Sequence, residues 1–296
     1  MNSVINYFYE MNIIDIYKCN DEYIFNYNSN TYKFIRYDRN IEELNEILEI
    51  SSELRKRNVI TNELIYNRFN SYLTNLDGEL YILIKEKIRE YDISLNDIIY
   101  IQNNTLNISL NRNIYKRNYI ELWANKIDFY EKKSIDLNKY ELINKSLDYY
   151  IGLGENAITY LRNNGVKTIN LVLSHRRLND FYNPLNYILD SRARDVAEYI
   201  KIHFFYDDIS EDVIISMLRS INFNREEYIL FVARMLYPTY YYDLIDKIIF
   251  SDGDEQIIKN VTNKGEAYIK LIKDLFIFIN YNLRMNIPVI EWIIKK

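Results

Sequence analysis

The sequence predicts an α+β protein in which a small β-rich segment precedes a larger helical one. Short runs of β-branched and aromatic residues, separated by Asn-rich turns, fill the first part of the chain. In the second part, apolar residues recur at the spacing of one helix face. The length of 296 residues exceeds what one hydrophobic core usually supports. We therefore expect two domains, at residues 1–88 and 89–296.

The small domain has a predicted order of three strands, one helix and two strands. These elements are expected at residues 13–16, 23–27, 31–37, 41–54, 69–74 and 80–84. Asn40 is placed to cap the helix, and Glu42 and Glu43 in the first turn complement the helix dipole. Asp77-Gly78 is typical of a tight hairpin turn between the last two strands.

The second domain begins with a long predicted helix over residues 143–161, which Gly165 ends. Gly152 and Gly154 lie inside this helix, where each glycine costs about 1 kcal/mol relative to alanine. Close packing against the backbone is therefore expected at both positions. A strand at 169–173 and an irregular segment at 174–184 precede further helices near 194–205, 210–221, 226–236, 240–249, 255–282 and 288–294.

The composition excludes several classes of protein. The net charge is -5, whereas a nucleic-acid binder needs clustered positive charge. Cys19 is the single cysteine, so neither an internal disulfide nor a Cys/His zinc site is expected, and a reducing cytoplasmic compartment fits. No apolar run approaches the roughly 18 residues of a membrane span, and the N-terminus does not read as a signal peptide. We expect no membrane insertion.

Four ordered segments point to a family. They read LDYYIGLGENAITYL, LSHRRL, NPLNYILDSRARDVAEYIKIHFF and ARMLYPTYYYDLIDKII, and together they extend over about a third of the chain. This series resembles the kinase-like spore-coat proteins of the YutH/CotS type, distant relatives of the aminoglycoside and choline phosphotransferases. The resemblance implies a bilobal protein-kinase-like fold, with a five-stranded small lobe carrying one helix and a larger helical lobe.

The resemblance also implies where a nucleotide would be held. Active phosphotransferases cover the triphosphate with a glycine-rich loop and neutralise it with a lysine. The covering loop would lie at residues 17–22, which contain no glycine. Strand alternation places Arg36 at the position of the family lysine, with Lys33 on the opposite face. The helix partner of Arg36 would be Glu46 or Glu49.

The catalytic loop of active relatives reads His-x-Asp, and its aspartate accepts the substrate proton. Here the segment is His175-Arg176-Arg177, so Arg177 replaces the aspartate, and a guanidinium does not release its proton at physiological pH. Asp180 is the candidate substitute base. His175 matches the family histidine that supports the loop from within.

The metal-binding positions of the family fall on Asn186 and Asp190. The interval between them is shorter than active relatives need, so the loop looks truncated. Asp195 matches a structural aspartate that caps its helix and bonds to the catalytic-loop backbone. Either ATP with Mg²⁺ or no cofactor at all is compatible with these residues.

The favoured hypothesis is a pseudokinase. The glycine loop, the lysine and the His-x-Asp aspartate all depart from the active pattern. The resemblance implies a protein of the mother-cell cytoplasm or the spore coat that binds coat proteins or other proteins, and the 30 tyrosines suit such contacts. One alternative is a divergent ATP-dependent small-molecule phosphotransferase that uses Arg36, Asp190 and Asp180. Another is a kinase-fold adaptor unrelated to sporulation.

Overall fold

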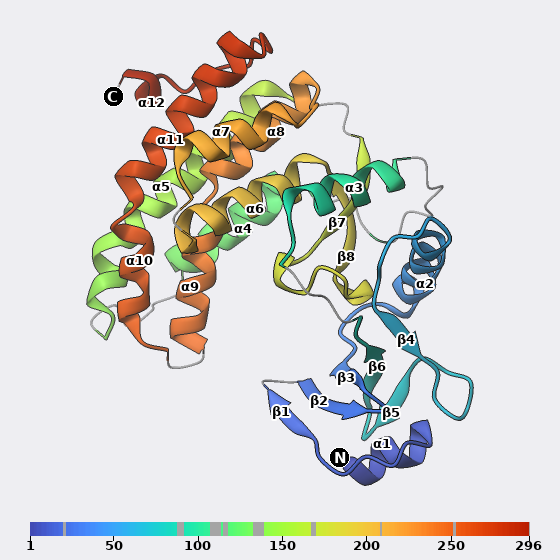
Figure 1. Cartoon of the computed structure of the whole chain (residues 1–296). Helices are drawn as coiled ribbons and strands as arrows, with labels where there is room; N and C mark the ends of the chain where they lie inside the picture. The colour runs from blue at the N-terminus through green and yellow to red at the C-terminus, as the bar shows by residue number, and fades with distance from the viewer. Residues whose placement is uncertain are drawn as a thin grey trace. The chain divides into compact units, whose positions relative to one another are not determined.

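The structure is a computed structural model that describes residues 1–19, 22–87, 92–106, 114, 118–132, 139–166, 170–207, 209–250 and 253–295. Its backbone contacts divide the chain into two compact units (Figure 1). Unit 1 comprises Met1–Tyr115 and His175–Leu189, and unit 2 comprises Lys116–Ser174 and Asp190–Lys296. The domain boundary expected between residues 88 and 89 stays a prediction.

Unit 1 contains an antiparallel sheet with strand order β1-β2-β3-β6-β4, and β5 pairs with β6. Its strands are β1 Tyr17–Cys19, β2 Glu22–Tyr27, β3 Asn30–Arg36, β4 Glu63–Ile65, β5 Thr74–Leu76 and β6 Glu79–Lys85. The predicted hairpin is confirmed, because β5 and β6 pair around Asp77 and Gly78, whose φ angles are 52° and 89°. Positive φ at both central residues matches the twist of the flanking strands.

The strand predicted at residues 13–16 is wrong, the strand predicted at 69–74 overlaps β5 only at Thr74, and neither β1 nor β4 was predicted. Residues 13–16 have no strand partner, because the Asn6 side chain bonds to both backbone groups of Ile13. The amide oxygen of Asn6 accepts from the Ile13 N–H at 2.8 Å, and its nitrogen donates to the Ile13 carbonyl at 3.3 Å. These two groups are therefore not available to a neighbouring strand.

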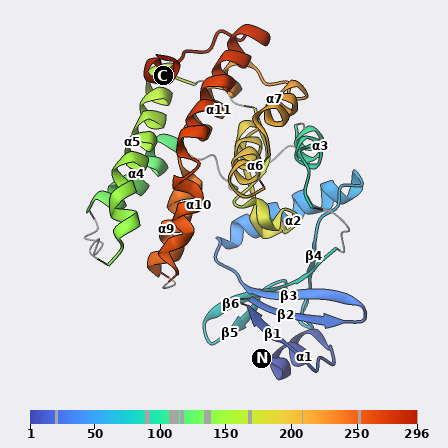
Figure 2. The ribbon, with the colours of Figure 1, turned by 60° about the vertical axis from the view of Figure 1, so that its left-hand side comes forward.

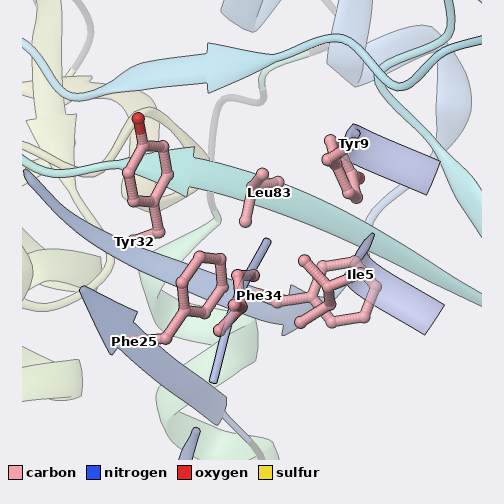
Figure 3. Packing of buried hydrophobic residues seen from close by; sticks show 7 residues of the cluster. Ile5, Tyr9, Phe25, Tyr32, Phe34 and Leu83 are labelled. Atoms are coloured by element: carbon pink, nitrogen blue, oxygen red, sulfur yellow. The ribbon is translucent and has the colours of Figure 1, made fainter. Parts of the chain in front are cut away.

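Helix α1 (Asn2–Tyr9), which was not predicted, covers one face of this sheet. Figure 3 shows Ile5 and Tyr9 of the helix packed against Phe34 and Leu83 of the sheet. The Tyr9 hydroxyl lies 2.9 Å from Thr74 Oγ1, so the polar end of this buried ring is also satisfied.

Helix α2 (Ile41–Lys56) begins as predicted. The Asn40 side chain accepts from the Glu42 N–H at 3.1 Å, and the buried face carries Leu44, Ile47 and Leu54. Helix α3 (Leu95–Thr105) follows, with a capping box between Ser94 and Asp97. Strands β7 (Leu171–His175) and β8 (Tyr187–Ser191) form a separate two-stranded sheet, and the chain between them contains two short 3₁₀ turns, Leu178–Asp180 and Pro184–Asn186. The strand predicted at 169–173 starts too early, because residue 170 is not in a strand. Residue 169 lies outside the described residues.

Unit 2 is helical within its described residues apart from the strand ends (Figures 1 and 2). Its helices are α4 Tyr119–Lys132, α5 Glu141–Asn164, α6 Ala193–Tyr206, α7 Glu211–Arg219, α8 Arg225–Leu236, α9 Thr239–Phe250, α10 Lys259–Thr262, α11 Gly265–Ile277 and α12 Glu291–Lys295. Helix α8 is buried almost throughout and packs against α5, α6 and α11. No helix among the described residues is both long and apolar enough to cross a membrane.

The prediction of one continuous helix at 255–282 is wrong, because the helix is interrupted. It is divided into a 3₁₀ turn at Glu255–Ile258, α10, α11 and a π-helical turn at Phe278–Asn282. The break before α11 lies at Lys264, whose ammonium donates to the carbonyls of Phe204 and Phe205 at 3.1 and 3.0 Å. This tertiary tether and the low helix propensity of Gly265 together account for the interruption.

Many tyrosines are core residues of unit 2. The Tyr268 hydroxyl donates to the Met235 carbonyl at 2.7 Å, and the Tyr242 hydroxyl donates to the Tyr150 carbonyl at 3.1 Å. The Tyr130 hydroxyl donates to Asp246 Oδ1 at 2.6 Å. Burial of these rings therefore leaves their hydroxyls satisfied, as buried polar groups require.

The two glycines of α5 have different surroundings. A Cβ at Gly154 would lie 2.9 Å from Ile127 Cδ1 and 3.1 Å from the Tyr242 hydroxyl, which confirms the predicted close approach. At Gly152 a Cβ would meet nothing within 4 Å, so the prediction was wrong there.

The two positions form a matched pair for measurement. Gly152→Ala should stabilise the protein by about 1 kcal/mol, because alanine favours the helix and meets open space. Gly154→Ala should lose that gain and destabilise the protein, because Tyr242 is held by its bond to Tyr150 and by stacking on Tyr130 at 5.1 Å. Urea unfolding of both variants checks this, and equal stabilisation by both would contradict the packing at Gly154.

Candidate functional site

The loop between β7 and β8 begins with a buried histidine. His175 is 2% exposed, and its ring stacks on Phe181 with centroids 4.0 Å apart. Tyr187 meets the same ring edge-on at 5.4 Å, and the Tyr187 hydroxyl donates to Thr61 Oγ1 at 3.0 Å. The structure thus places His175 as a packing residue in the interior of unit 1.

Asn186 joins the two ends of this loop. Its side-chain oxygen accepts from the Arg177 N–H at 2.9 Å. Its amide nitrogen donates to the carbonyls of Arg177 and Asp180, the latter at 3.0 Å. Asn186 is 8% exposed, so these bonds are largely shielded from water. The amide that was predicted to face a metal is engaged with the loop backbone.

Asp180 lies near a lysine of the sheet. The Asn183 amide donates to Asp180 Oδ2 at 2.6 Å, which fixes the orientation of the carboxylate. Asp180 Oδ1 lies 3.9 Å from the ammonium of Lys33, on β3. Lys33 in turn forms an ion pair with Glu86 at 2.6 Å.

The electrostatic surroundings of Lys33 are acidic. Burial disfavours its charged form, but the hydrogen bond that Lys33 donates to Glu86 and the charges of Asp180, Glu86 and Glu22 outweigh that effect and raise the pKa of Lys33. Burial raises the pKa of Glu22, Lys33 lowers it, and the other two carboxylates raise it further. Three carboxylates therefore surround one ammonium.

Arg36, the residue predicted for the site cation, lies on the surface of unit 1. Its side chain is 56% exposed and pairs with Glu79 at 2.5 Å. Arg36 shares its strand face with Tyr32 and Phe34, the face that α1 covers, whereas Lys33 points to the other face. The unpredicted helix α1 reverses the assignment of faces, so Lys33 and not Arg36 lies beside Asp180.

The two predicted helix partners also lie elsewhere. Glu46 is buried, and its carboxylate accepts from the Ile114 N–H at 2.7 Å. Glu49 is on an exposed position of α2.

The contact that joins α2 to the loop comes instead from Arg39. Its Nη1 donates to the carbonyls of Leu185 and Tyr187 at 2.9 and 2.6 Å, and its Nε donates to Glu43 at 2.6 Å. Arg39 was missed by the sequence analysis, and the only signal for it was a basic residue next to the helix cap.

In unit 2, Asp190 is 3% exposed and forms an ion pair with Arg194 at 3.1 Å. It also accepts from the Ser191 N–H at 2.7 Å. Burial raises the pKa of Asp190, while Arg194 and Arg234 oppose that rise. Asp195 is 1% exposed in the first turn of α6, and Arg192 rather than Asp195 occupies the N-cap position.

A network of buried charges that the sequence analysis missed lies on α6 and α8. Lys201 is 1% exposed, and its ammonium donates to Glu198 Oε1 at 2.8 Å, Thr239 Oγ1 at 2.7 Å and the Arg234 carbonyl at 3.0 Å. The Arg234 guanidinium donates to the same Glu198 oxygen at 2.7 Å. The Glu198-x-x-Lys201 spacing on a helix was the available signal.

The pKa values of Lys201 and Glu198 are both lower than their ordinary values. Burial lowers the pKa of Lys201 to about 8, although Glu198 opposes the change. Burial alone would raise the pKa of Glu198, but Lys201 and Arg234 outweigh it and lower that pKa to about 2. Among the described residues, no three His, Cys, Asp or Glu side chains gather to hold a metal ion.

Removing the Asn186 amide should destabilise unit 1. Asn186→Ala leaves Arg177 and Asp180 backbone groups unpaired in a buried position, so we expect a loss of about 2 to 4 kcal/mol in urea unfolding. Asn186→Asp should also cost stability, because it keeps the acceptor and loses both donated bonds. Glu49→Ala, at an exposed position, is the control and should change stability by less than about 0.5 kcal/mol. Wild-type stability of Asn186→Ala would show that these bonds do not hold the loop.

Removing Glu198 should cost more than removing an exposed carboxylate. Glu198→Gln leaves Lys201 and Arg234 without their shared counter-charge, so we expect a loss of about 3 to 5 kcal/mol at pH 7. The exposed Glu141, which pairs with Lys145, supplies the control, and Glu141→Gln should cost less than about 1 kcal/mol.

The same variant should alter the response to acid. Unfolded chains protonate Glu198 near its ordinary pKa of 4.5, whereas the folded chain keeps the charge down to about pH 2. The stabilisation is therefore present above pH 4.5 and is lost as the pH falls to 2. The stability difference between wild type and Glu198→Gln should shrink over this window, as urea unfolding at several pH values will show; a difference that does not vary with pH would contradict the assignment.

The comparisons with known proteins agree with this architecture. An aminoglycoside phosphotransferase from Alicyclobacillus acidocaldarius subsp. acidocaldarius shares 10% identity and a TM-score of 0.64, covering 93% of this chain and 95% of its own. The spectinomycin phosphotransferase APH(9)-Ia, solved with ADP and spectinomycin, shares 12% identity and a TM-score of 0.63, covering 93% and 96%. The amicoumacin kinase hAmiN shares 9% identity and a TM-score of 0.55, covering 92% and 91%. These similarities confirm the predicted kinase-like, aminoglycoside-phosphotransferase-like fold.

The sequence itself gives the family. No curated protein matches the chain significantly. The profile of the family described as "Spore coat putative kinase YutH" matches residues 2–280, nearly the whole chain. The match confirms the resemblance found in the sequence, and the chain belongs to the YutH family of kinase-like spore-coat proteins.

Proposed function

We propose that this kinase-fold protein has no phosphotransferase activity and acts by binding other proteins, in the spore coat or in the mother-cell cytoplasm. The observation that carries this proposal is the pairing of Lys33 with Glu86 at 2.6 Å and its proximity to Asp180 at 3.9 Å. With Glu22 nearby, acidic groups outnumber the one ammonium in this cluster. The excess negative charge of this cluster would repel a triphosphate, and its one ammonium is already paired.

The candidate metal ligands support the same conclusion. Mg²⁺ needs oxygen ligands that are free to face it. The Asn186 oxygen accepts from the Arg177 N–H, and Asp190 is paired with Arg194 in a buried position. Each oxygen would have to give up an existing bond to bind a metal, so these residues fit Mg²⁺ and ATP poorly.

The residues of the proton-transfer step are also unsuited to catalysis. Arg177 stands where active relatives have their base, and it cannot accept a proton. Asp180, the candidate substitute, already accepts from Asn183 and lies beside Lys33.

Unit 1 offers a surface that suits a protein partner. Tyr7 on α1 and Phe69 are 54% and 60% exposed, and the Arg68 guanidinium lies over both rings at 4.9 and 5.8 Å. Tyr66, 55% exposed, stacks on Tyr72 in the same segment. Exposed aromatic residues together with arginine are the composition that protein interfaces favour.

A divergent ATP-dependent small-molecule phosphotransferase remains the second candidate. The two amide bonds to Asp180 favour it: the Asn186 amide donates to the Asp180 carbonyl at 3.0 Å, and the Asn183 amide donates to its carboxylate at 2.6 Å. These bonds hold the candidate base in a fixed orientation in unit 1. The two candidates differ in whether nucleotide binds.

Thermal unfolding with and without Mg-ATP separates the two candidates. We expect no stabilisation of the wild type at millimolar nucleotide, because Lys33 is already paired. A ligand at 100 times its dissociation constant would stabilise the fold by about 2.7 kcal/mol, which is easily seen. Lys33→Gln is the matched variant: a Mg-dependent shift of the wild type that disappears in Lys33→Gln would overturn the pseudokinase proposal and favour the phosphotransferase.

A second measurement tests the assembly role in sporulating cells. A fluorescent fusion of the chain should localise to the spore coat, and the double variant Tyr7→Ser, Phe69→Ser should reduce that localisation. Tyr281→Ser, which changes a 79% exposed ring in unit 2, is the control. Unchanged localisation of the double variant would exclude this surface as the docking site.

A further inference from the structure

A groove of about 880 Å³ lies in unit 2 between α5 and α11, and Ile293 of α12 also lines it. Figure 2 shows α5 and α11 next to one another. The groove contains none of the residues that the sequence predicted for a nucleotide or metal site. Its volume falls within the roughly 300 to 1,000 Å³ that is typical of small-molecule sites.

A tyrosine hydroxyl without a protein partner opens into this groove. Tyr150 is 2% exposed, and its ring is fixed by stacking on Tyr241 at 3.8 Å. Its hydroxyl forms no hydrogen bond within the part of the chain that the structure describes, although it lines the groove. A Cβ at Gly265 would lie 3.7 Å from this hydroxyl, so the glycine keeps the approach to it open. An acceptor on a ligand in the groove could take the hydrogen bond that this hydroxyl otherwise offers to water.

The charges at the groove leave one cation available. Lys145 is paired with Glu141, and Lys270 with Glu211 at 2.7 Å and Asp274 at 3.4 Å. Lys273 is half-buried and has no ion pair or hydrogen bond among the described residues.

One carboxylate opposes a highly charged anion. Glu266 is exposed at the groove. Burial of Tyr149 is the main cause of its raised pKa, and the negative charge of Glu266 raises that pKa further. Because Lys270 is held between Glu211 and Asp274 and Glu266 is exposed, the groove has no excess positive charge, which disfavours a polyphosphate and leaves Lys273 to pair with a single acidic group.

The remaining walls are aromatic and apolar. Tyr149, 48% exposed, lies edge-on to Tyr150, while Ile269 and Ile293 supply aliphatic surface. We propose that this groove binds a small aromatic monoanion. Its ring lies against Tyr149 and the isoleucines, and its acidic group accepts hydrogen bonds from Tyr150 and Lys273.

The test uses 8-anilinonaphthalene-1-sulfonate, an aromatic monoanion whose fluorescence rises on binding, with the full folded chain. We expect saturable binding at one site per chain. Lys273→Gln should weaken it about tenfold, and Tyr150→Phe should weaken it several-fold, as expected for the loss of a charge-assisted and a neutral hydrogen bond. Glu266→Gln should tighten it, because it removes the opposing charge.

Two controls separate this site from non-specific dye binding. N-phenyl-1-naphthylamine has the same ring system without the sulfonate, so its affinity should not respond to Lys273→Gln. Lys247→Gln removes an exposed lysine that does not line the groove and should leave the affinity for the anionic dye unchanged. Non-saturable binding, or equal affinities for wild type, Lys273→Gln and Glu266→Gln, would overturn the proposal. Because the opposite effects of Lys273→Gln and Glu266→Gln cannot come from a general loss of folding, the result is independent of the nucleotide measurement on Lys33.

Discussion

The hydrogen bonds between buried side chains and the backbone of the β7–β8 loop are the constraint on which unit 1 depends. Asn186 ties Arg177 to Asp180, and Arg39 ties the carbonyls at the far end of the loop to the start of α2. Short 3₁₀ turns leave backbone groups without regular partners, and buried groups of this kind are costly unless side chains satisfy them. Asn186, the residue predicted as a metal ligand, thus bonds to the backbone of the loop on both sides.

The charged side chains of Lys33 and Asp190 also find their partners within the chain. Lys33 and Asp190, which lie at positions considered above for a nucleotide and its metal, each have an oppositely charged neighbour: Glu86 for Lys33, and Arg194 for Asp190. Charges taken out of water are costly unless they are paired, and these pairs supply a partner without a ligand. This pairing is compatible with the proposed role in assembly.

The sequence could predict the elements whose signals are local. Asn40 begins α2 and Asp77-Gly78 forms the hairpin because caps and tight turns depend on a few neighbouring residues. The sheet faces that Lys33 and Arg36 occupy could not be predicted in the same way. Choosing between Lys33 and Arg36 required knowing which sheet face is covered, and that is decided by α1, a helix short enough to lack a clear periodic signal. The side-chain bonds from Asn6 to Ile13 are likewise invisible to a pattern of strand propensities.

The buried tyrosines of unit 2 differ in the hydrogen-bond partners of their hydroxyls. In unit 2, Tyr268, Tyr160 and Tyr242 donate their hydroxyls to backbone carbonyls, whereas the buried Tyr119 hydroxyl has no hydrogen-bond partner among the described residues. Tyr150 is as buried as they are, yet its hydroxyl faces the groove between α5 and α11 without a protein partner among the described residues. Phenylalanine would fill the same packing position, so the hydroxyl is the part of Tyr150 that the proposed ligand would use. Lys273 lines the same groove, and its ammonium would favour an anionic acceptor there.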